Sequence, residues 1–237
     1  RVMEAKLAVL RELFGQAPPS AAEEGFRAAN WEWLGPYAHW CSLRDQYGTS
    51  DMTLWGTDEH FDPARLEAAR SDSEHRDLEF WCWVQYHLHR QLTRAVGHVH
   101  SLGIALKGDL PIGVAPNSVE TWTRPELFHL ATQAGAPPDD FAVRGQNWGF
   151  PTYDWDAMAS DEYQWWKDRF IAMRAYADAA AVPATKPRGP MSMPTMPPTS
   201  APAAPRPKPS TVGRSSTVVS ISPASVCTTT AASSSAS

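Results

Sequence analysis

Residues 103–155 decide the fold and the class of function. They begin GIALKGDLPIGVAPNSVETW (103–122) and, after a short connection, end GAPPDDFAVRGQNWGFPTYDW (135–155). A short apolar run carries one acidic residue, Asp109, and is followed by a long segment rich in Gly, Pro, Asn, Gln and Trp. Aromatic rings bind flat apolar faces, and amides supply hydrogen-bond donors and acceptors. This composition is therefore typical of a groove for a polar, flat-faced ligand such as a sugar.

The apolar run 104–112 is predicted to be a strand. It follows a helical pattern that Gly103 ends, and a helix followed by such a run indicates an α/β unit with a parallel strand buried on both faces. In α/β barrels the ligand-binding residues lie at the carboxyl ends of strands, where Asp109 falls. Asp109 is either such a residue or a structural acid that caps the next turn, and its position alone favours neither reading.

The two segments after this strand are predicted to differ in kind. Residues 122–134 are expected to be helical from Pro125. Residues 135–155 are expected to form an irregular loop, because they contain the breakers Pro137, Pro138, Gly145, Gly149 and Pro151. A loop of that length in a compact domain is usually functional.

Apolar periodicity predicts helices elsewhere, over 2–14, 21–29, 63–70, 74–101 and 156–178, with a separate short buried helix within 31–47. Ser20 with Glu23 is typical of a capping box for the second helix, and Pro36 is expected to open the buried one.

Two side-chain patterns on these helices bear on function. Arg44 and Asp45 are adjacent, so they are expected to point apart and not to pair. His87 and His89 do not share a helix face, and neither do His98 and His100. We therefore expect solvated or hydrogen-bonded structural histidines and no metal site.

Composition divides the chain at about residue 181. All 11 Trp and all 26 acidic residues lie before residue 182, whereas five of the 21 basic residues lie after it. Residues 1–181 are predicted to form one folded domain, and residues 182–237, rich in Pro, Ser, Thr and Ala, a disordered tail. The acidic body argues against nucleic acid as a partner.

The chain shows no feature of a membrane or secreted protein. It has no apolar run of membrane-spanning length and no signal peptide. Its three cysteines are widely spaced, which predicts no disulfide framework and suits a reducing, cytoplasmic location. Position 1 is Arg instead of an initiator Met, so we expect the chain to start inside a longer protein.

Several motifs over residues 1–171 resemble, in order, those of the 4-α-glucanotransferases, also called amylomaltases or disproportionating enzymes. They are WLGPYAHWCSLRD, VQYHLHRQL, KGDLPIGVAPNSVETWTRPELF, GAPPDDF, GQNWGFPTYDW and YQWWKDRF. The match is most similar to the cytosolic plant and algal type that acts on maltose and branched heteroglycan. The resemblance implies an α/β fold, here a helix-rich part of a (β/α)₈ (TIM) barrel, and no cofactor.

The same resemblance implies a reaction and a set of substrate-binding residues. The family transfers α-1,4-glucan segments or glucosyl units from maltose or malto-oligosaccharides to glucan acceptors by a retaining mechanism, consistent with paired carboxylates at the scissile bond. Asp109 is implied to lie near the bound sugar, and Asp139 in a lid-like loop over the cleft. In that loop Gln146 and Asn147 are implied to hydrogen-bond sugar hydroxyls, and Trp148 to stack on a ring.

Departures from the family pattern concern catalysis. The family's nucleophile lies in a motif like R-I-D-H-x-x-G after the helix that here ends WWKDRF, and this sequence has no such motif. Ala115-Pro116 and Asp140 stand where an acidic–basic pair and Tyr are expected. The sequence thus predicts an internal fragment without the three catalytic carboxylates. The alternatives are a non-catalytic α-glucan-binding fragment and, more weakly, an interaction protein that uses its Pro-rich tail.

Overall fold

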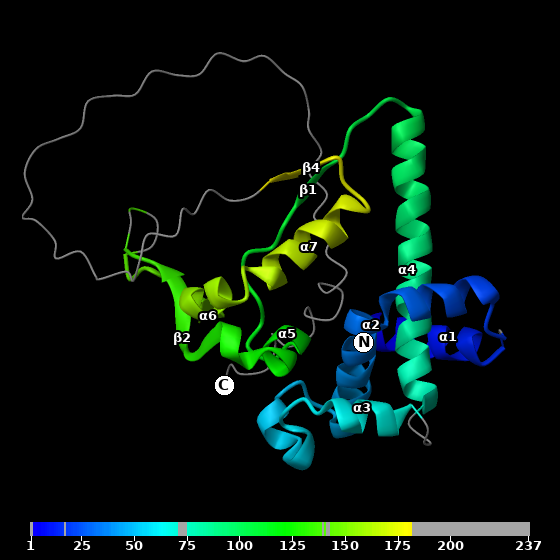
Figure 1. The fold of residues 1–237 in the computed structure, drawn as a ribbon, viewed down its shortest axis with the longest axis horizontal. Helices are drawn as coiled ribbons and strands as arrows, with labels where there is room; N and C mark the ends of the chain where they lie inside the picture. Colours follow the sequence, from blue (N-terminus) through cyan, green and yellow to red (C-terminus); the bar gives the residue numbers. More distant parts are fainter. Residues whose placement is uncertain (1, 17, 71–74, 139, 141–142, 182–237) are drawn as a thin grey trace, which may run out of the picture.

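The structure is a computed structural model, and it describes residues 2–16, 18–70, 75–138, 140 and 143–181. The predicted tail, 182–237, lies outside the described residues. In Figure 1 the helices of residues 2–69 gather around the N-terminal half of the long helix α4 (His75–Ser101), and a β-hairpin lies on the opposite side of the molecule. No helix in the described part is both long and apolar enough to cross a membrane.

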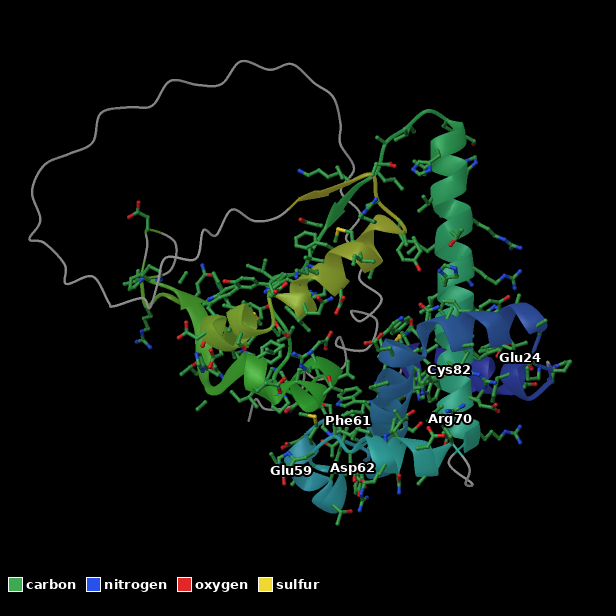
Figure 2. All side chains as sticks on the ribbon, in the orientation of Figure 1. Glu24, Glu59, Phe61, Asp62, Arg70 and Cys82 are labelled. Atoms are coloured by element: carbon green, nitrogen blue, oxygen red, sulfur yellow. The ribbon has the colours of Figure 1, made fainter. Side chains whose placement is uncertain are left out.

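The helical part contains α1 (Val2–Gln16), α2 (Ala21–Tyr47) and α3 (Pro63–Ala69). The 3₁₀ turns η1 (Met52–Leu54) and η2 (Gly56–Asp58) lie between α2 and α3. The Ser20 side chain accepts a hydrogen bond from the Glu23 amide, so the Ser20 half of the predicted capping box is confirmed. Asp62 caps α3, with Pro63 at its first position as predicted. Arg70 follows α3 and lies 4.4 Å over the Trp31 ring, which fastens α3 to α2 (Figure 2).

The prediction of two helices between residues 21 and 47 is wrong. One helix, α2, runs through Pro36. An interior proline costs roughly 3 kcal/mol of helix stability. The segment around it nevertheless buries Leu34, Tyr37, Trp40 and Leu43 against α4, and each large apolar side chain contributes about 1.5–3 kcal/mol when buried. Tertiary packing therefore outweighs the local break.

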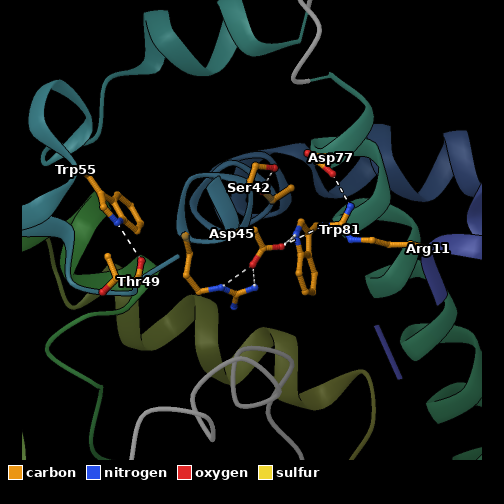
Figure 3. A network of polar contacts seen from close by, with 9 residues as sticks. Arg11, Ser42, Asp45, Thr49, Trp55, Asp77 and Trp81 are labelled. Atoms are coloured by element: carbon orange, nitrogen blue, oxygen red, sulfur yellow. Dashed lines mark hydrogen bonds and ion pairs between the residues drawn. The ribbon is translucent and has the colours of Figure 1, made fainter. Parts of the chain in front are cut away.

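The prediction that Arg44 and Asp45 do not pair is also wrong. Asp45 Oδ1 accepts hydrogen bonds from Arg44 Nε at 3.0 Å and Nη2 at 2.6 Å. The guanidinium lies over the rings of Trp40 and Trp81, and a side chain of this length can bend back to its neighbour. Asp45 Oδ2 also accepts from Trp81 Nε1 and Arg11, so one carboxylate joins α1, α2 and α4 (Figure 3).

The strand after α4 is confirmed as a parallel strand but is smaller than predicted. Gly103 ends the helix region with φ of 70°. Strand β1 (Lys107–Asp109) then pairs in parallel with β4 (Ala179–Ala181). It has three residues and is exposed or half-buried, so burial on both faces is wrong within the described residues. A strand with one neighbour leaves much of its surface uncovered.

The predictions for residues 122–155 are wrong over most of this range, although a short 3₁₀ helix does begin at Pro125. After α5 (Val119–Thr123) and η3 (Pro125–Leu127), residues 128–136 form strand β2 (Phe128–Ala136), which pairs antiparallel with β3 (Gln146–Tyr153). The breakers that suggested an irregular loop are divided between the connection and points of irregular register, such as Pro151 opposite Gln133. Proline is tolerated in an edge strand or at such an irregularity.

The C-terminal helical region is two helices instead of the single one predicted over 156–178. They are α6 (Trp155–Ser160) and α7 (Gln164–Arg174). Glu162 and Tyr163 have φ of 56° and 60°, and this left-handed pair breaks the helix. A second core forms where the hairpin meets these helices, with Leu127, Phe128, Met158 and Trp165 buried.

Candidate functional site

The structure brings three of the five predicted site residues together and separates a fourth. Gln146, Asn147 and Trp148 are consecutive and exposed at the start of β3. Asp109 is half-buried at the end of β1, which belongs to the other two-stranded sheet. Asp139 lies outside the described residues.

The hairpin depends on glycines at the end where the connection joins its two strands. Gly135 of β2 is paired with Asn147, and a Cβ at position 135 would lie 2.2 Å from the Gln146 carbonyl oxygen. Gly145 has φ of 71°, and a Cβ there would lie 2.6 Å from the Ala136 carbonyl oxygen. Only residues without a side chain allow the two backbones to approach this closely. These two glycines therefore set where Gln146, Asn147 and Trp148 emerge.

Trp148 presents its indole at the surface with 47% of the residue exposed. The indole Nε1 donates a hydrogen bond to Gln146 Oε1 at 3.0 Å. The ring lies 5.7 Å from that of Phe150, with 30° between their planes. An exposed aromatic face held in this way is suited to stacking on the apolar face of a planar or ring-shaped ligand.

Asn147 is bonded on both sides of its amide. Its Nδ2 donates to Gln133 Oε1 across the hairpin at 2.5 Å, and its Oδ1 accepts from the Gly149 amide at 2.9 Å. The second contact spans two residues and encloses Trp148 in a tight turn in which Gly149 has φ of 72°. That bond also brings in Gln133, which the sequence did not indicate, because Gln133 reaches Asn147 only once the strands pair.

The loop after β1 is fastened to the hairpin and to α7. A Cβ at Gly113 would lie 2.7 Å from the Phe150 ring, so Phe150 packs directly on that glycine backbone. The Tyr153 hydroxyl donates to the Ile112 carbonyl, and Arg169 Nη2 donates to the Pro111 carbonyl at 2.7 Å. Burial raises the pKa of Tyr153 to about 12, so this hydroxyl remains a donor at neutral pH.

Two histidines of α4 are hydrogen-bonded to the C-terminal part of the described chain, in agreement with the prediction of hydrogen-bonded histidines. His89 Nδ1 lies 2.7 Å from the Tyr176 hydroxyl, and His100 Nε2 lies 2.9 Å from Asp178 Oδ2. Burial lowers the pKa of His87, whose ring lies against Trp83. Over the described residues, no group of three or more His, Cys, Asp or Glu side chains could hold a metal ion.

The described residues form an α/β protein with a parallel β1–β4 pair, a helix-rich body and a hairpin that exposes Trp148 beside Gln146 and Asn147. The profile of the Glyco_hydro_77 family, described as 4-alpha-glucanotransferase, matches residues 1–182. The chain belongs to the 4-alpha-glucanotransferase family, as its motifs predicted.

Relatives in this family are much longer than the matched region. The 4-alpha-glucanotransferase DPE2 of Oryza sativa subsp. japonica is 42% identical over 183 residues, which cover 75% of this chain and 19% of the rice protein. A 4-alpha-glucanotransferase of Chlamydia muridarum is 33% identical over 140 residues, 58% of this chain and 26% of that protein. The chain thus spans well under half the length of these relatives.

Solved amylomaltases share the fold. The amylomaltase from Streptococcus agalactiae, in complex with acarbose, aligns with a TM-score of 0.57 and 26% identity over 65% of this chain and 32% of that one. The amylomaltase from Corynebacterium glutamicum has the same TM-score at 23% identity, and covers 73% of this chain and 23% of its own. At that identity the second likeness concerns the fold alone.

Proposed function

We propose that this chain is the part of a 4-α-glucanotransferase that binds the glucan through the β2–β3 hairpin. The whole enzyme transfers α-1,4-glucan segments or glucosyl units from maltose or malto-oligosaccharides to glucan acceptors, including branched glucan or heteroglycan. The exposed indole of Trp148, whose Nε1 donates to Gln146, carries the proposal, since an exposed aromatic face suits the apolar face of a sugar ring. Family membership supplies the reaction.

The β1–β4 pair supports the proposal that these residues belong to a (β/α)₈ barrel. The two strands are parallel, and the chain between them contains α7, which packs next to β4. A strand–helix–parallel strand unit is the repeating element of that barrel. In this arrangement Asp109, at the end of β1, lies on the face where barrels bind their ligands, and we assign it a role in positioning the sugar.

We propose further that the 237 residues bind glucan without turning it over. A retaining mechanism needs a carboxylate nucleophile and a carboxylic acid on either side of the scissile bond. The sequence contains no R-I-D-H motif, and strands β2 and β3 contain no carboxylate residue. Cys41 and Cys82 are buried free thiols, which suit a reducing compartment, and we therefore place the whole enzyme in the cytoplasm.

Calorimetric titration of the full chain with maltoheptaose tests the binding proposal. We expect saturable binding that Trp148→Ala weakens by roughly tenfold or more, the value of an aromatic stacking contact of about 1.5 kcal/mol. Trp33→Ala is the matched control, because Trp33 is 43% exposed but lies on α2, outside the hairpin. Equal affinity in the Trp148→Ala variant would remove the hairpin from the site.

Incubation with maltotriose and glycogen separates binding from catalysis. We expect no release of glucose, in keeping with a non-catalytic α-glucan-binding chain. Release of glucose at a rate proportional to the concentration of purified chain would contradict the proposal that the catalytic carboxylates are not among these 237 residues.

A further inference from the structure

The amides of the hairpin are already engaged with the protein. Asn147 donates to Gln133 Oε1 and accepts from the Gly149 amide, and Gln146 Oε1 accepts from the Trp148 indole. A sugar hydroxyl that used these oxygens would compete with hydrogen bonds of 2.5 to 3.0 Å. The amide oxygens of Gln133, Gln146 and Asn147 are therefore not available to a ligand unless these internal hydrogen bonds break.

Each of these bonds restrains Trp148. Gln146 holds the indole nitrogen and so selects the side-chain rotamer. The hydrogen bond from the Gly149 amide to Asn147 closes a turn that fixes the backbone of Trp148. Gln133 accepts a hydrogen bond from Asn147 and so keeps Asn147 in place. Phe150 supports the ring from one side and itself lies on Gly113. The indole is thus restrained through its side chain, its backbone and its ring.

Restraint of an exposed aromatic side chain improves binding without a new contact. A mobile tryptophan must lose rotamer freedom when a ligand stacks on it, and an immobilised side chain has lost that freedom beforehand. The expected gain is roughly two- to tenfold in affinity for one side chain.

We propose that Gln133 is a positioning residue for glucan binding, and that Gln146 and Asn147 position Trp148 instead of contacting the sugar. This inference rests on the proposed function, since it explains how the same hairpin presents its aromatic face. It adds Gln133, from the opposite strand, to the residues on which glucan affinity depends.

Paired substitutions distinguish positioning from direct contact. In both glutamines the oxygen accepts the internal hydrogen bond. Gln133→Glu and Gln146→Glu keep an acceptor at that place but lose the amide donor, whereas Gln133→Met and Gln146→Met lose both. Positioning predicts that the Met variants bind maltoheptaose two- to tenfold more weakly and that the Glu variants at pH 7 stay within twofold of the parent. Direct donation to the sugar predicts that the Glu variants lose as much affinity as the Met variants, and that result would overturn the proposal, as would Met variants that bind like the parent.

A second measurement needs no sugar. The indole N–H resonance of Trp148, assigned by its loss in Trp148→Phe, reports the hydrogen bond to Gln146 in full-length ¹⁵N-labelled chain. We expect this resonance to move and exchange faster in Gln146→Met, and to stay slowly exchanging in Gln146→Glu. An unchanged resonance in Gln146→Met refutes positioning. If the parent fails to bind maltoheptaose, the proposed function fails, and the indole resonance alone then decides whether the residues position Trp148.

Discussion

Replacement of Gly135 by alanine is the sharpest perturbation of the hairpin. A Cβ on Gly135 would lie 2.2 Å from the Gln146 carbonyl oxygen and 3.3 Å from its carbonyl carbon, whereas ordinary contacts begin at 3.4 Å. Both obstructing atoms are backbone, so no side-chain rotation relieves the clash. Strand β3 must move away from β2 by about 1 Å.

The cost follows from the strand pairing. The pairs Gly135–Asn147 and Ala136–Gln146 flank the clash, and both lose their geometry when the strands separate. Each hydrogen bond contributes about 0.5–1.5 kcal/mol net, so loss of two weakens the local structure by roughly 1–3 kcal/mol. Local opening of the hairpin should then increase roughly fivefold to a hundredfold.

Hydrogen exchange measured residue by residue tests this estimate. We expect faster exchange at residues 146–149 in Gly135→Ala, unchanged exchange in α4, and weaker binding of maltoheptaose. Gly97→Ala is the matched control, because Gly97 lies in α4 with open space around it, and alanine there should stabilise the helix by about 0.5–1 kcal/mol. Parent-like exchange at residues 146–149 in Gly135→Ala would refute the argument that close strand approach sets the hairpin.

Three further predictions concern the rest of the chain. Asp45→Ala should lower the free energy of unfolding by about 1–3 kcal/mol in urea, because it leaves the indole N–H of the buried Trp81 without its acceptor, and Asp45→Asn, which keeps an acceptor, should cost less. The pKa of Asp178 lies below its usual 3.8 because the Leu106 amide and His100 donate hydrogen bonds to its carboxylate. Its contribution to stability is therefore present above pH 3.8 and is lost as pH falls through the folded-state pKa. The NMR chemical shift of the Leu106 amide between pH 6 and 2 should show this transition, and Asp178→Asn should abolish it. Cys82 lies where α4 crosses α2 (Figure 2), and burial raises the pKa of its thiol from 9.0 to about 12. Because the thiol ionises more readily in the unfolded chain, stability is lost as pH rises above 9. The urea midpoint should therefore decline between pH 8 and 10.5, and this decline should be smaller in Cys82→Ala.

Local signals in the sequence predicted the helical part well. The stripes of α1 and α4, the cap at Ser20, the start of α3 at Pro63 and the stop at Gly103 were all correct. Each depends on residues within a few positions of one another, so the sequence alone contains the necessary information. The family followed from uninterrupted motifs and was confirmed by the match over residues 1–182.

Features that depend on distant partners were mispredicted. The local break at Pro36 gave way to packing against α4, and Arg44 reached Asp45 because two tryptophan rings guide its side chain. The local sequence of β2 favours a helix because its partner, β3, begins ten residues further on and the intervening glycines and prolines give no sign of pairing.

The sequence by itself therefore determined the family, the main helices and the residue types of the proposed sugar-binding surface, including Trp148. The tertiary structure decided that these residues stand on a hairpin and that Gln133, which pairs with Pro151 in the strand register, reaches Asn147 through its side chain. It also assigned the oxygen of Gln146 to the indole of Trp148. Residue type records what a side chain can bond to, but only the register between strands fixes which partner it meets.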